Sequence, residues 1–225
     1  YFGTYTGPTI GVTYMSPLSG EYSHHNQLKA VPANDPAQDG DLVSCELTGN
    51  MAVYVPLFEA VGIEPSEETA AGDWLNLPDG VAMKLRSGQR WVLDMHYINT
   101  TDQTLLVNNG VNLDSVPEES VEQWAAAMQF DNGGPAVPAG SSQTDSFDCA
   151  FESDMQILSL LGHMHARGTS YAMDYTNQAG EQSRVYDIPE WDGGYYPFYP
   201  MILSYTDGEF PVQAGDSLKT TCSWF

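Results

Sequence analysis

The sequence predicts an all-β protein of the sandwich or barrel kind, and three observations support this. Short runs rich in β-branched and aromatic residues recur along the whole chain. Turn residues separate these runs, since the 225 residues include 21 Gly and 14 Pro. Helices have little room, because only residues 65–69 and 117–123 are passable helical turns. Short strands at this spacing are typical of sandwiches and barrels.

The expected strands follow one another in order, each bounded by Gly, Pro or Asn. The first part of the chain is expected to form strands at residues 9–15, 42–47, 51–57, 81–85, 90–98 and 103–113. After Pro117 the pattern resumes, with strands expected at residues 121–130, 145–151, 155–164, 169–175, 182–187, 201–205 and 216–224. The last run stops in mid-pattern, which predicts that the native polypeptide continues.

The length of the chain allows one large β domain or two domains of about 110 residues each. The best boundary is Pro117-Glu118-Glu119. It divides the chain into residues 1–118, with three histidines, and residues 119–225, with two.

Composition excludes several classes of partner. Thirty acidic residues against seven basic ones give a formal charge of -23, so neither nucleic acid nor an anionic membrane surface is expected to bind. No stretch approaches the roughly 18 apolar residues that span a bilayer. The chain starts at Tyr1 instead of Met and contains no signal peptide, so we expect a processed or partial chain. A removed export signal is compatible with that start, and we expect the protein to be secreted, extracellular or periplasmic. The odd number of cysteines (Cys45, Cys149 and Cys222) predicts a free thiol or a partner outside the chain.

Metal binding is indicated by the histidines, because all five fall in three short clusters: His24-His25, His96 and His163-Met164-His165. Residues i and i+2 of a strand share a face, so His163 and His165 would point together and chelate one ion. His24 and His25 are adjacent, so they can share a metal only at a strand end or a bulge. A second interpretation stays open, because a single histidine such as His96 is more often a hydrogen-bonded core residue.

Four motifs in a fixed order carry a family resemblance. The first is the His-His pair within Tyr22-Ser23-His24-His25-Asn26, and the second is Leu93-Asp94-Met95-His96-Tyr97-Ile98-Asn99, which follows the turn Leu77-Pro78-Asp79-Gly80-Val81. The third is His163-Met164-His165-Ala166-Arg167-Gly168, and the last runs from Ala214 to Trp224 and is similar to a G-D-x-L-x-x-x-C strand. Together they resemble the copper type II, ascorbate-dependent monooxygenases, the family of peptidylglycine α-hydroxylating monooxygenase and dopamine β-monooxygenase.

The resemblance implies a fold and a set of cofactors. The family fold is two tandem antiparallel β-sandwich domains of jelly-roll type, each with one copper, so two copper ions per chain are expected. Ascorbate would be the reductant, and O2 and a small-molecule substrate would be the partners. The first domain would carry the electron-transfer copper, bound by His24, His25 and His96.

The resemblance also assigns the catalytic copper, where O2 reacts and the substrate is hydroxylated. His163 and His165 would bind it in the second domain. In the family a methionine thioether completes this site, from an E-M-C segment that would lie downstream of Phe225. A soft thioether favours Cu(I), the state that must meet oxygen.

Departures from the family pattern bear on the substrate. Leu161 stands where the peptide-amidating branch has an arginine that binds the substrate carboxylate, so a peptidyl-glycine substrate is not expected. The acidic surface would attract an amine. Cys149 and Cys222 resemble family half-cystines whose partners would lie downstream, and Cys45 has no evident partner. Two other functions stay open: a non-catalytic extracellular copper-binding protein of the same fold, and a structural or adhesive double β-sandwich module.

Two further features have open explanations. Gly162 and Gly168 flank the His-x-His motif, and either a close backbone approach or an ordinary turn would explain them. Asn99-Thr100-Thr101 is an N-glycosylation sequon, which matters only in a host that modifies it.

Overall fold

The computed structural model describes residues 1–19, 23–43, 54–61, 77–97, 99, 101–128, 130, 136–164, 167–191, 202–205 and 208–225. These residues form β-strands and one short 3-10 helix, η3 (Glu118–Ser120), with no α-helix among them. The all-β prediction is therefore confirmed. Within the same residues no helix is long and apolar enough to cross a bilayer.

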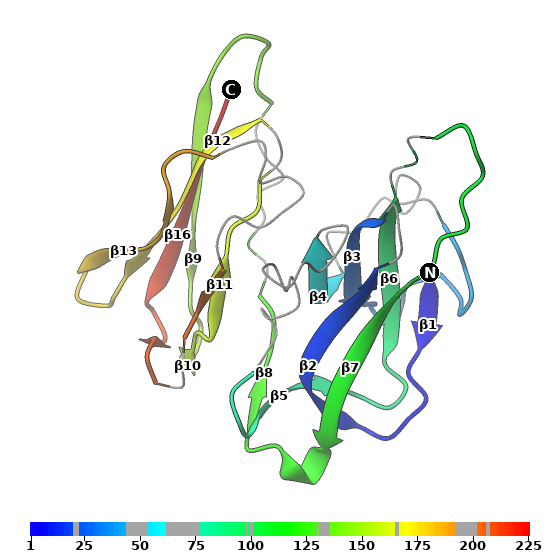
Figure 1. The fold of residues 1–225 in the computed structure, drawn as a ribbon. Coiled ribbons are helices and arrows are strands. Elements are labelled where there is room, and N and C mark those ends of the chain that lie inside the picture. Colours follow the sequence, from blue (N-terminus) through cyan, green and yellow to red (C-terminus); the bar gives the residue numbers. More distant parts are fainter. Residues whose placement is uncertain are drawn as a thin grey trace. The chain divides into compact units, whose positions relative to one another are not determined.

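The chain divides into two compact units, Tyr1–Gln129 and Phe130–Phe225 (Figure 1). The boundary expected after residue 118 falls inside the first unit. The reason is a strand beyond that point, β8 (Gln123–Ala125), which pairs in parallel with β5 (Val81–Leu85) and so belongs to a sheet of the first unit.

The first unit is a sandwich of two four-stranded sheets (Figure 1). One sheet has the order β1-β6-β3-β4, and its strands are Phe2–Thr4, Arg90–Tyr97, Ser23–Ala30 and Val55–Val61. The other has the order β7-β2-β5-β8, in which β7 is Asn109–Pro117 and β2 is Ile10–Ser19. Apart from β5 and β8, the neighbouring strands of these sheets run antiparallel.

The core of the first unit lies between the two sheets. Val12 and Met15 of β2 are buried there with Met83 of β5, at 1%, 2% and 5% exposure. Leu28 of β3 and Leu57 of β4 reach the same cluster from the facing sheet. Burial of these apolar side chains removes them from water and holds the sheets together.

A second cluster covers the other face of the β1-β6-β3-β4 sheet, near the start of β6. It is formed by four buried side chains, those of Phe2, Val31, Tyr54 and Val92. Arg90 holds the segment that follows Val31 in place. Its guanidinium donates hydrogen bonds to the carbonyls of Pro32, Asp35 and Ala37. The start of β6 is therefore buried on both faces of the sheet.

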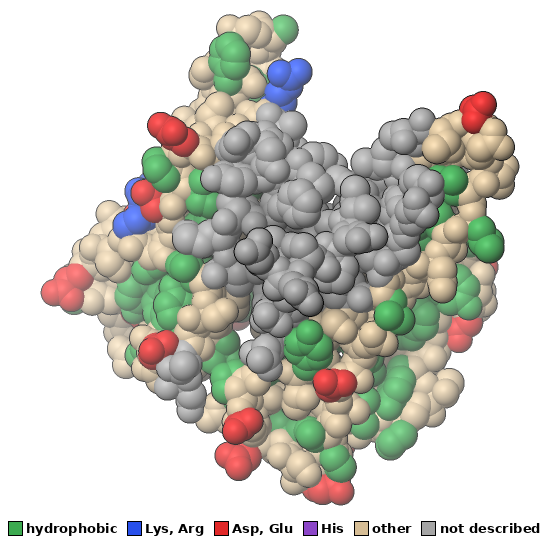
Figure 2. Space-filling model, viewed as in Figure 1, with side chains coloured by type: hydrophobic (Ala, Val, Ile, Leu, Met, Phe, Trp, Pro, Cys, Tyr) green, Lys and Arg blue, Asp and Glu red, His purple; other side chains and the backbone are tan. Residues whose placement is uncertain are grey.

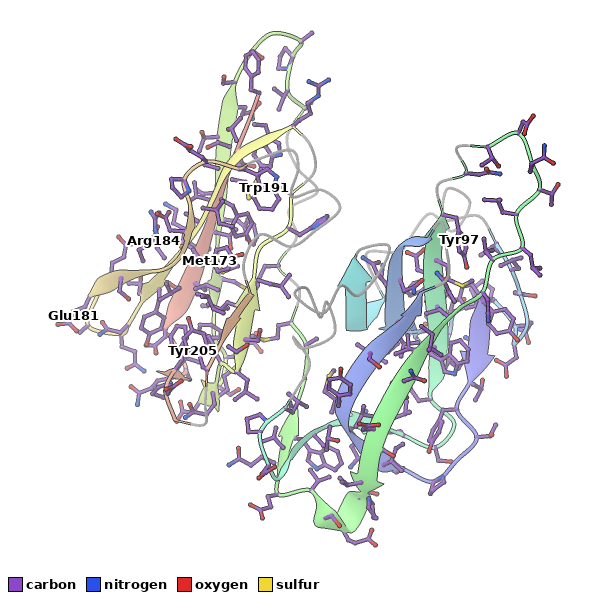
Figure 3. The ribbon with its side chains drawn as sticks, viewed as in Figure 1. Tyr97, Met173, Glu181, Arg184, Trp191 and Tyr205 are labelled. Carbon is purple, nitrogen blue, oxygen red and sulfur yellow. The ribbon has the colours of Figure 1, made fainter. Side chains whose placement is uncertain are left out.

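The second unit is built on a four-stranded antiparallel sheet of order β13-β12-β16-β9, with strands Gln182–Ile188, Gly168–Thr176, Ser217–Trp224 and Gln143–Ala150. Two short antiparallel pairs accompany it: β10 (Met155–Gln156) with β15 (Pro211–Val212), and β11 (Ser159–Leu161) with β14 (Ile202–Ser204). One core joins them, since Met173 (labelled in Figure 3) and Leu218 of the large sheet are buried with Leu160 and Val212 of the short pairs.

Asp216 organises the start of β16. It is only 1% exposed, and its carboxylate accepts hydrogen bonds from the Tyr175 hydroxyl at 2.5 Å and from the backbone N–H groups of Gln213 and Gln178 at 2.7 and 2.9 Å. These bonds, that of Tyr175 first, lower the pKa of Asp216, and the same bond raises the pKa of Tyr175 to about 12. Gly215 has φ of 95°, which favours glycine. The Gly-Asp motif thus has a structural role.

The observed strands differ from the expected ones at several places, and the short strands β1 and β15 are not among the expected ones. No strand is expected over β3, whose residues are mostly polar and include no β-branched side chain, and pairing with β6 and β4 makes it a strand. The strand expected at residues 103–113 begins only at Asn109. The run expected at residues 155–164 is two short strands. The helical turn at 65–69 and residues 44–47 of an expected strand lie outside the described residues.

We expect Tyr175→Phe to lower the midpoint temperature of unfolding by about 4 to 8 °C, the shift that one lost hydrogen bond causes in a domain of about 100 residues. Tyr205→Phe is the matched control. Both rings pack on Phe210, with centroids at 5.4 and 5.2 Å, but the Tyr205 hydroxyl makes no hydrogen bond to a described residue. Thermal unfolding followed by circular dichroism measures both variants, and an equal loss in both would contradict the role of Asp216.

The stability difference should also depend on pH. Because the pKa of Asp216 is lowered on folding, its hydrogen bonds stabilise fully above the ordinary carboxyl pKa of 3.8 and are lost as the pH falls through the lowered value. The gap between wild type and Tyr175→Phe should stay constant from neutral pH to about pH 4 and shrink below it. Urea unfolding at a series of pH values checks this, and a gap that widens in acid would refute it.

Candidate metal centre

The histidines expected to bind metal lie on β3, on β6 and after β11. His24 and His25 belong to β3, and His96 belongs to β6. The structure describes the backbone of these three, but their side chains and the whole of His165 lie outside the described residues. His163 is described and exposed. The structural information on the site therefore comes from strand register and from the residues around the histidines.

The register of β3 and β6 brings two of the three clusters together in the first unit. His25 pairs directly with His96 across this antiparallel ladder. Directly paired residues have Cβ atoms about 4.5 to 5.5 Å apart and lie on the same face of the sheet. Two histidines that are 71 positions apart in the chain are thus cross-strand neighbours.

A bulge lies at the remaining histidine of the first unit. Ser23 pairs with Tyr97, whereas His25 pairs with His96, so β3 has one extra residue at His24. A bulge interrupts the strict alternation of a strand and re-aims the extra residue. This is the backbone condition that the adjacent pair His24-His25 requires in order to share one metal ion.

The buried residues of β3 show which face carries the row of positions 25 and 96. Asn26 is 0% exposed and its side-chain oxygen accepts a hydrogen bond from Asn109 of β7, in the facing sheet. Leu28 reaches the core between the sheets. Because successive residues alternate, positions 25 and 96 lie on the other face, away from the sandwich interior.

An ion pair lies further along that same face. Lys29 Nζ is 3.8 Å from Asp94 Oδ2, and the two side chains are only 12% and 10% exposed. Asp94 pairs with Gln27, and Lys29 pairs with Val92 of the outer apolar cluster. The sequence motifs do not single out this ion pair, because nothing in the spacing of Lys29 and Asp94 indicates that their strands are neighbours.

In the second unit the His-x-His segment leaves its strand before the histidines. β11 ends at Leu161, so the strand expected through Met164 stops three residues early. Burial still alternates, since Gly162 is buried, His163 is exposed and Met164 is 5% exposed in the core. The pairing of His163 with His165 stays a prediction, because His165 is not described.

Two glycines let this segment lie close to the core. A Cβ on Gly162 would come within 2.6 Å of Cε1 of Tyr171, and a Cβ on Gly168 would come within 2.9 Å of Cε of Met164. Neither glycine has φ in the left-handed region, so close approach explains them and turn geometry does not. Tyr171 packs in turn on Trp191, which is labelled in Figure 3, with ring centroids 6.3 Å apart.

The two described cysteines are free thiols on neighbouring strands. Cys149 pairs with Leu218 and Cys222 pairs with Asp145, so the thiols are separated by four residues, or about 13 Å along the ladder. They are too far apart to bond to each other. Burial, and then the Asp145 charge, raises the pKa of Cys222 to about 11. Cys45 lies outside the described residues, and the expected disulfide partners stay predictions.

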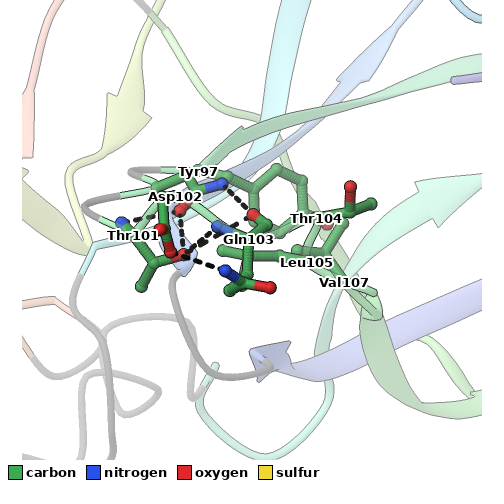
Figure 4. Close-up of a pocket in the computed structure, with 8 residues that line it drawn as sticks. Tyr97, Thr101, Asp102, Gln103, Thr104, Leu105 and Val107 are labelled. Atoms are coloured by element: carbon green, nitrogen blue, oxygen red, sulfur yellow. Dashed lines mark hydrogen bonds between the residues drawn. The ribbon is translucent and has the colours of Figure 1, made fainter.

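A pocket of about 490 Å³ opens beside Tyr97, the residue that follows His96 (Figure 4). Its polar wall is hydrogen-bonded within one loop. The side-chain oxygen of the exposed Asn99 accepts from the N–H and the hydroxyl of Thr101 at 2.9 and 2.8 Å, and the Gln103 amide donates to Asp102 at 2.6 Å. These bonds connect the residues of the loop to one another. We assign the candidate metal site to the paired strands β3 and β6, not to this pocket.

No three His, Cys, Asp or Glu side chains come together as a metal-binding group in the described part of the chain, which includes the side chain of one histidine out of five. No known protein-family model matches the chain, and no curated protein sequence matches it either.

We expect Gly162→Ala to lower the free energy of unfolding by about 1 to 3 kcal/mol, because the added methyl group meets the Tyr171 ring and overpacks the core. Gly110→Ala is the control, since its new Cβ would find Leu18 atoms at ordinary contact distances of 3.4 and 3.7 Å. Urea unfolding of the two variants gives the comparison. Equal stability of Gly162→Ala and wild type would show that the segment is not held against the core.

Proposed function

We propose that the chain is a copper-dependent monooxygenase, which hydroxylates an activated C–H bond of a small substrate with O2 and takes electrons from ascorbate. The observation that carries this proposal is the register of β3 and β6. It sets His25 opposite His96, next to a bulge at His24. Of the five histidines in the chain, three thus fall at one place on one sheet.

Two features of the first unit suit copper: the imidazole type of the donors and the position of these donors on inner strands of a sheet. Imidazole suits copper in both of its common oxidation states, and copper held there would supply one-electron redox chemistry. β3 and β6 are the two inner strands of the β1-β6-β3-β4 sheet, so each has hydrogen-bonded neighbours on both sides. The role of these strands is to fix the ligand positions before the metal binds.

The second unit would bind the copper at which the substrate is hydroxylated, through His163 and His165. The described residues support an exposed, anchored segment there: Met164 is buried below it, and Gly162 and Gly168 allow it to lie close to the core. Exposure of His163 leaves this position accessible to a substrate from solution. Anchoring on both sides limits how far the segment can move during a reaction.

The substrate we propose is a small molecule, with an amine as the favoured class. Leu161, at the end of β11, pairs with Ile202 and offers no charge for a substrate carboxylate. Acidic side chains are spread over the visible face of the protein (Figure 2), in keeping with a formal charge of -23. A field of that sign attracts cations to the surface and repels anions.

The first test, made on the longest native form of the polypeptide, is copper stoichiometry combined with ascorbate-dependent O2 uptake. We expect about two coppers per chain for the wild type and about one for His96→Ala and for His163→Ala, because each variant keeps the ligands of the other site. Metal analysis after dialysis measures this. The wild type should consume O2 with ascorbate when a panel of amines is supplied, and both variants should lose this uptake.

Each alternative function predicts a different result in that test. Copper binding without substrate-dependent O2 uptake would identify a non-catalytic copper-binding protein. No tight copper binding at all would overturn the proposal and leave a structural or adhesive double-sandwich module. The variants His96→Ala and His163→Ala act as each other's controls, since each removes one imidazole from a different unit.

A further inference from the structure

The Lys29–Asp94 ion pair is unusual among the ion pairs of the described residues. Its side chains are 12% and 10% exposed, whereas the Lys84–Glu118 side chains are 29% and 46% exposed, and Arg184, which pairs with Asp174 and Asp187, is 48% exposed. Its N···O distance of 3.8 Å is also longer than the 2.5 Å of Lys84–Glu118. A loose pair that is largely removed from water contributes little net stability, because desolvation offsets the attraction. Stability alone therefore does not explain it.

The position of the pair is defined by the strand register. Along this face of the sheet the paired positions are His25 with His96, then Gln27 with Asp94, then Lys29 with Val92. Successive pairs on one face are about 7 Å apart, because every second residue of a strand faces the same way. Asp94 is therefore one step from the histidine row, and Lys29 is two steps from it.

The order of these paired positions determines which residue of the ion pair is nearer to the histidines. In the register, the row of Asp94 lies between the histidine row and the row of Lys29, so the acidic residue of the pair is nearer to the histidines. Lys29 pairs directly with Val92, which belongs to the apolar cluster that includes Phe2. Low exposure on this side reduces the screening of the carboxylate by water, so its charge acts over a longer range than that of a surface residue.

We propose that Asp94, held in place by Lys29, is a positioning residue that sets the preference of the first copper site for Cu(II) over Cu(I). This inference rests on the proposed function, because it needs a copper held by His25 and His96. A negative charge one row away, about 7 Å along the strands, stabilises the dication more than the monocation. A site biased toward Cu(II) releases an electron more readily, which is the property required of an electron-transfer centre.

The test compares Asp94→Asn with Glu118→Gln in the full chain. Both changes remove one carboxylate charge from an ion pair of the first unit with little change in size, but Glu118 pairs with Lys84 on the other sheet of that unit. Competition with chromophoric chelators measures Cu(I) and Cu(II) affinities separately. We expect the ratio of Cu(II) to Cu(I) affinity to fall about tenfold in Asp94→Asn, the order expected for one charge at that distance, and to stay unchanged in Glu118→Gln.

Lys29→Gln gives a second, opposite readout. Removal of the ammonium group takes one positive charge away from the carboxylate, so the affinity ratio should rise in this variant. A ratio unchanged in Asp94→Asn, or Cu(I) and Cu(II) affinities that fall equally, would overturn the inference while the proposed function stands. Failure of wild type to bind copper through His25 and His96, seen as equal stoichiometry in wild type and His96→Ala, would overturn the proposed function and this inference with it.

Discussion

The antiparallel pairing of β3 with β6 is the constraint on which the first unit depends. A slip of one residue would move every side chain of β3 to the other face of the sheet. Such a slip would take Asn26 out of its hydrogen bond with Asn109 and Leu28 out of the core. Burial on the inner face therefore fixes the register, and the register in turn fixes which residues are neighbours on the outer face. The pairing of His25 with His96 therefore follows from contacts that other residues of β3 make on the inner face.

The second unit fixes its candidate segment by packing instead of by a ladder. The His-x-His motif comes after β11, and its described residues His163 and Met164 belong to no strand. Met164 and the close approach at Gly162 hold this segment against the core. Asp216 does comparable work at the other end of the large sheet, where one buried carboxylate joins the turn after β12 to the start of β16. At the ends of these strands, the packing at Gly162 and Met164 and the hydrogen bonds of Asp216 hold the chain in place.

Much of the fold follows from the sequence, and the failures have physical causes. The strands at residues 81–85 and 182–187 match the structure closely, because β-branched residues and flanking turns mark them. β3 escapes prediction since its polar residues form a strand through pairing with β6 and β4. The need for a bulge at His24-His25 follows from strand alternation alone, and the structure has an irregular register at that place. Which strands are neighbours does not follow from local pattern, so the approach of Lys29 to Asp94 needs the folded chain.

The tight packing at Gly162 and Gly168 also limits how this protein can change over evolutionary time. Any side chain at either position would collide with Tyr171 or Met164, so both sites accept substitution only together with a change in the core. The exposed position Arg167 carries no such restriction from packing. Sequence divergence among descendants of this chain is thus directed to the solvent side of the segment, where it can alter recognition without altering the fold.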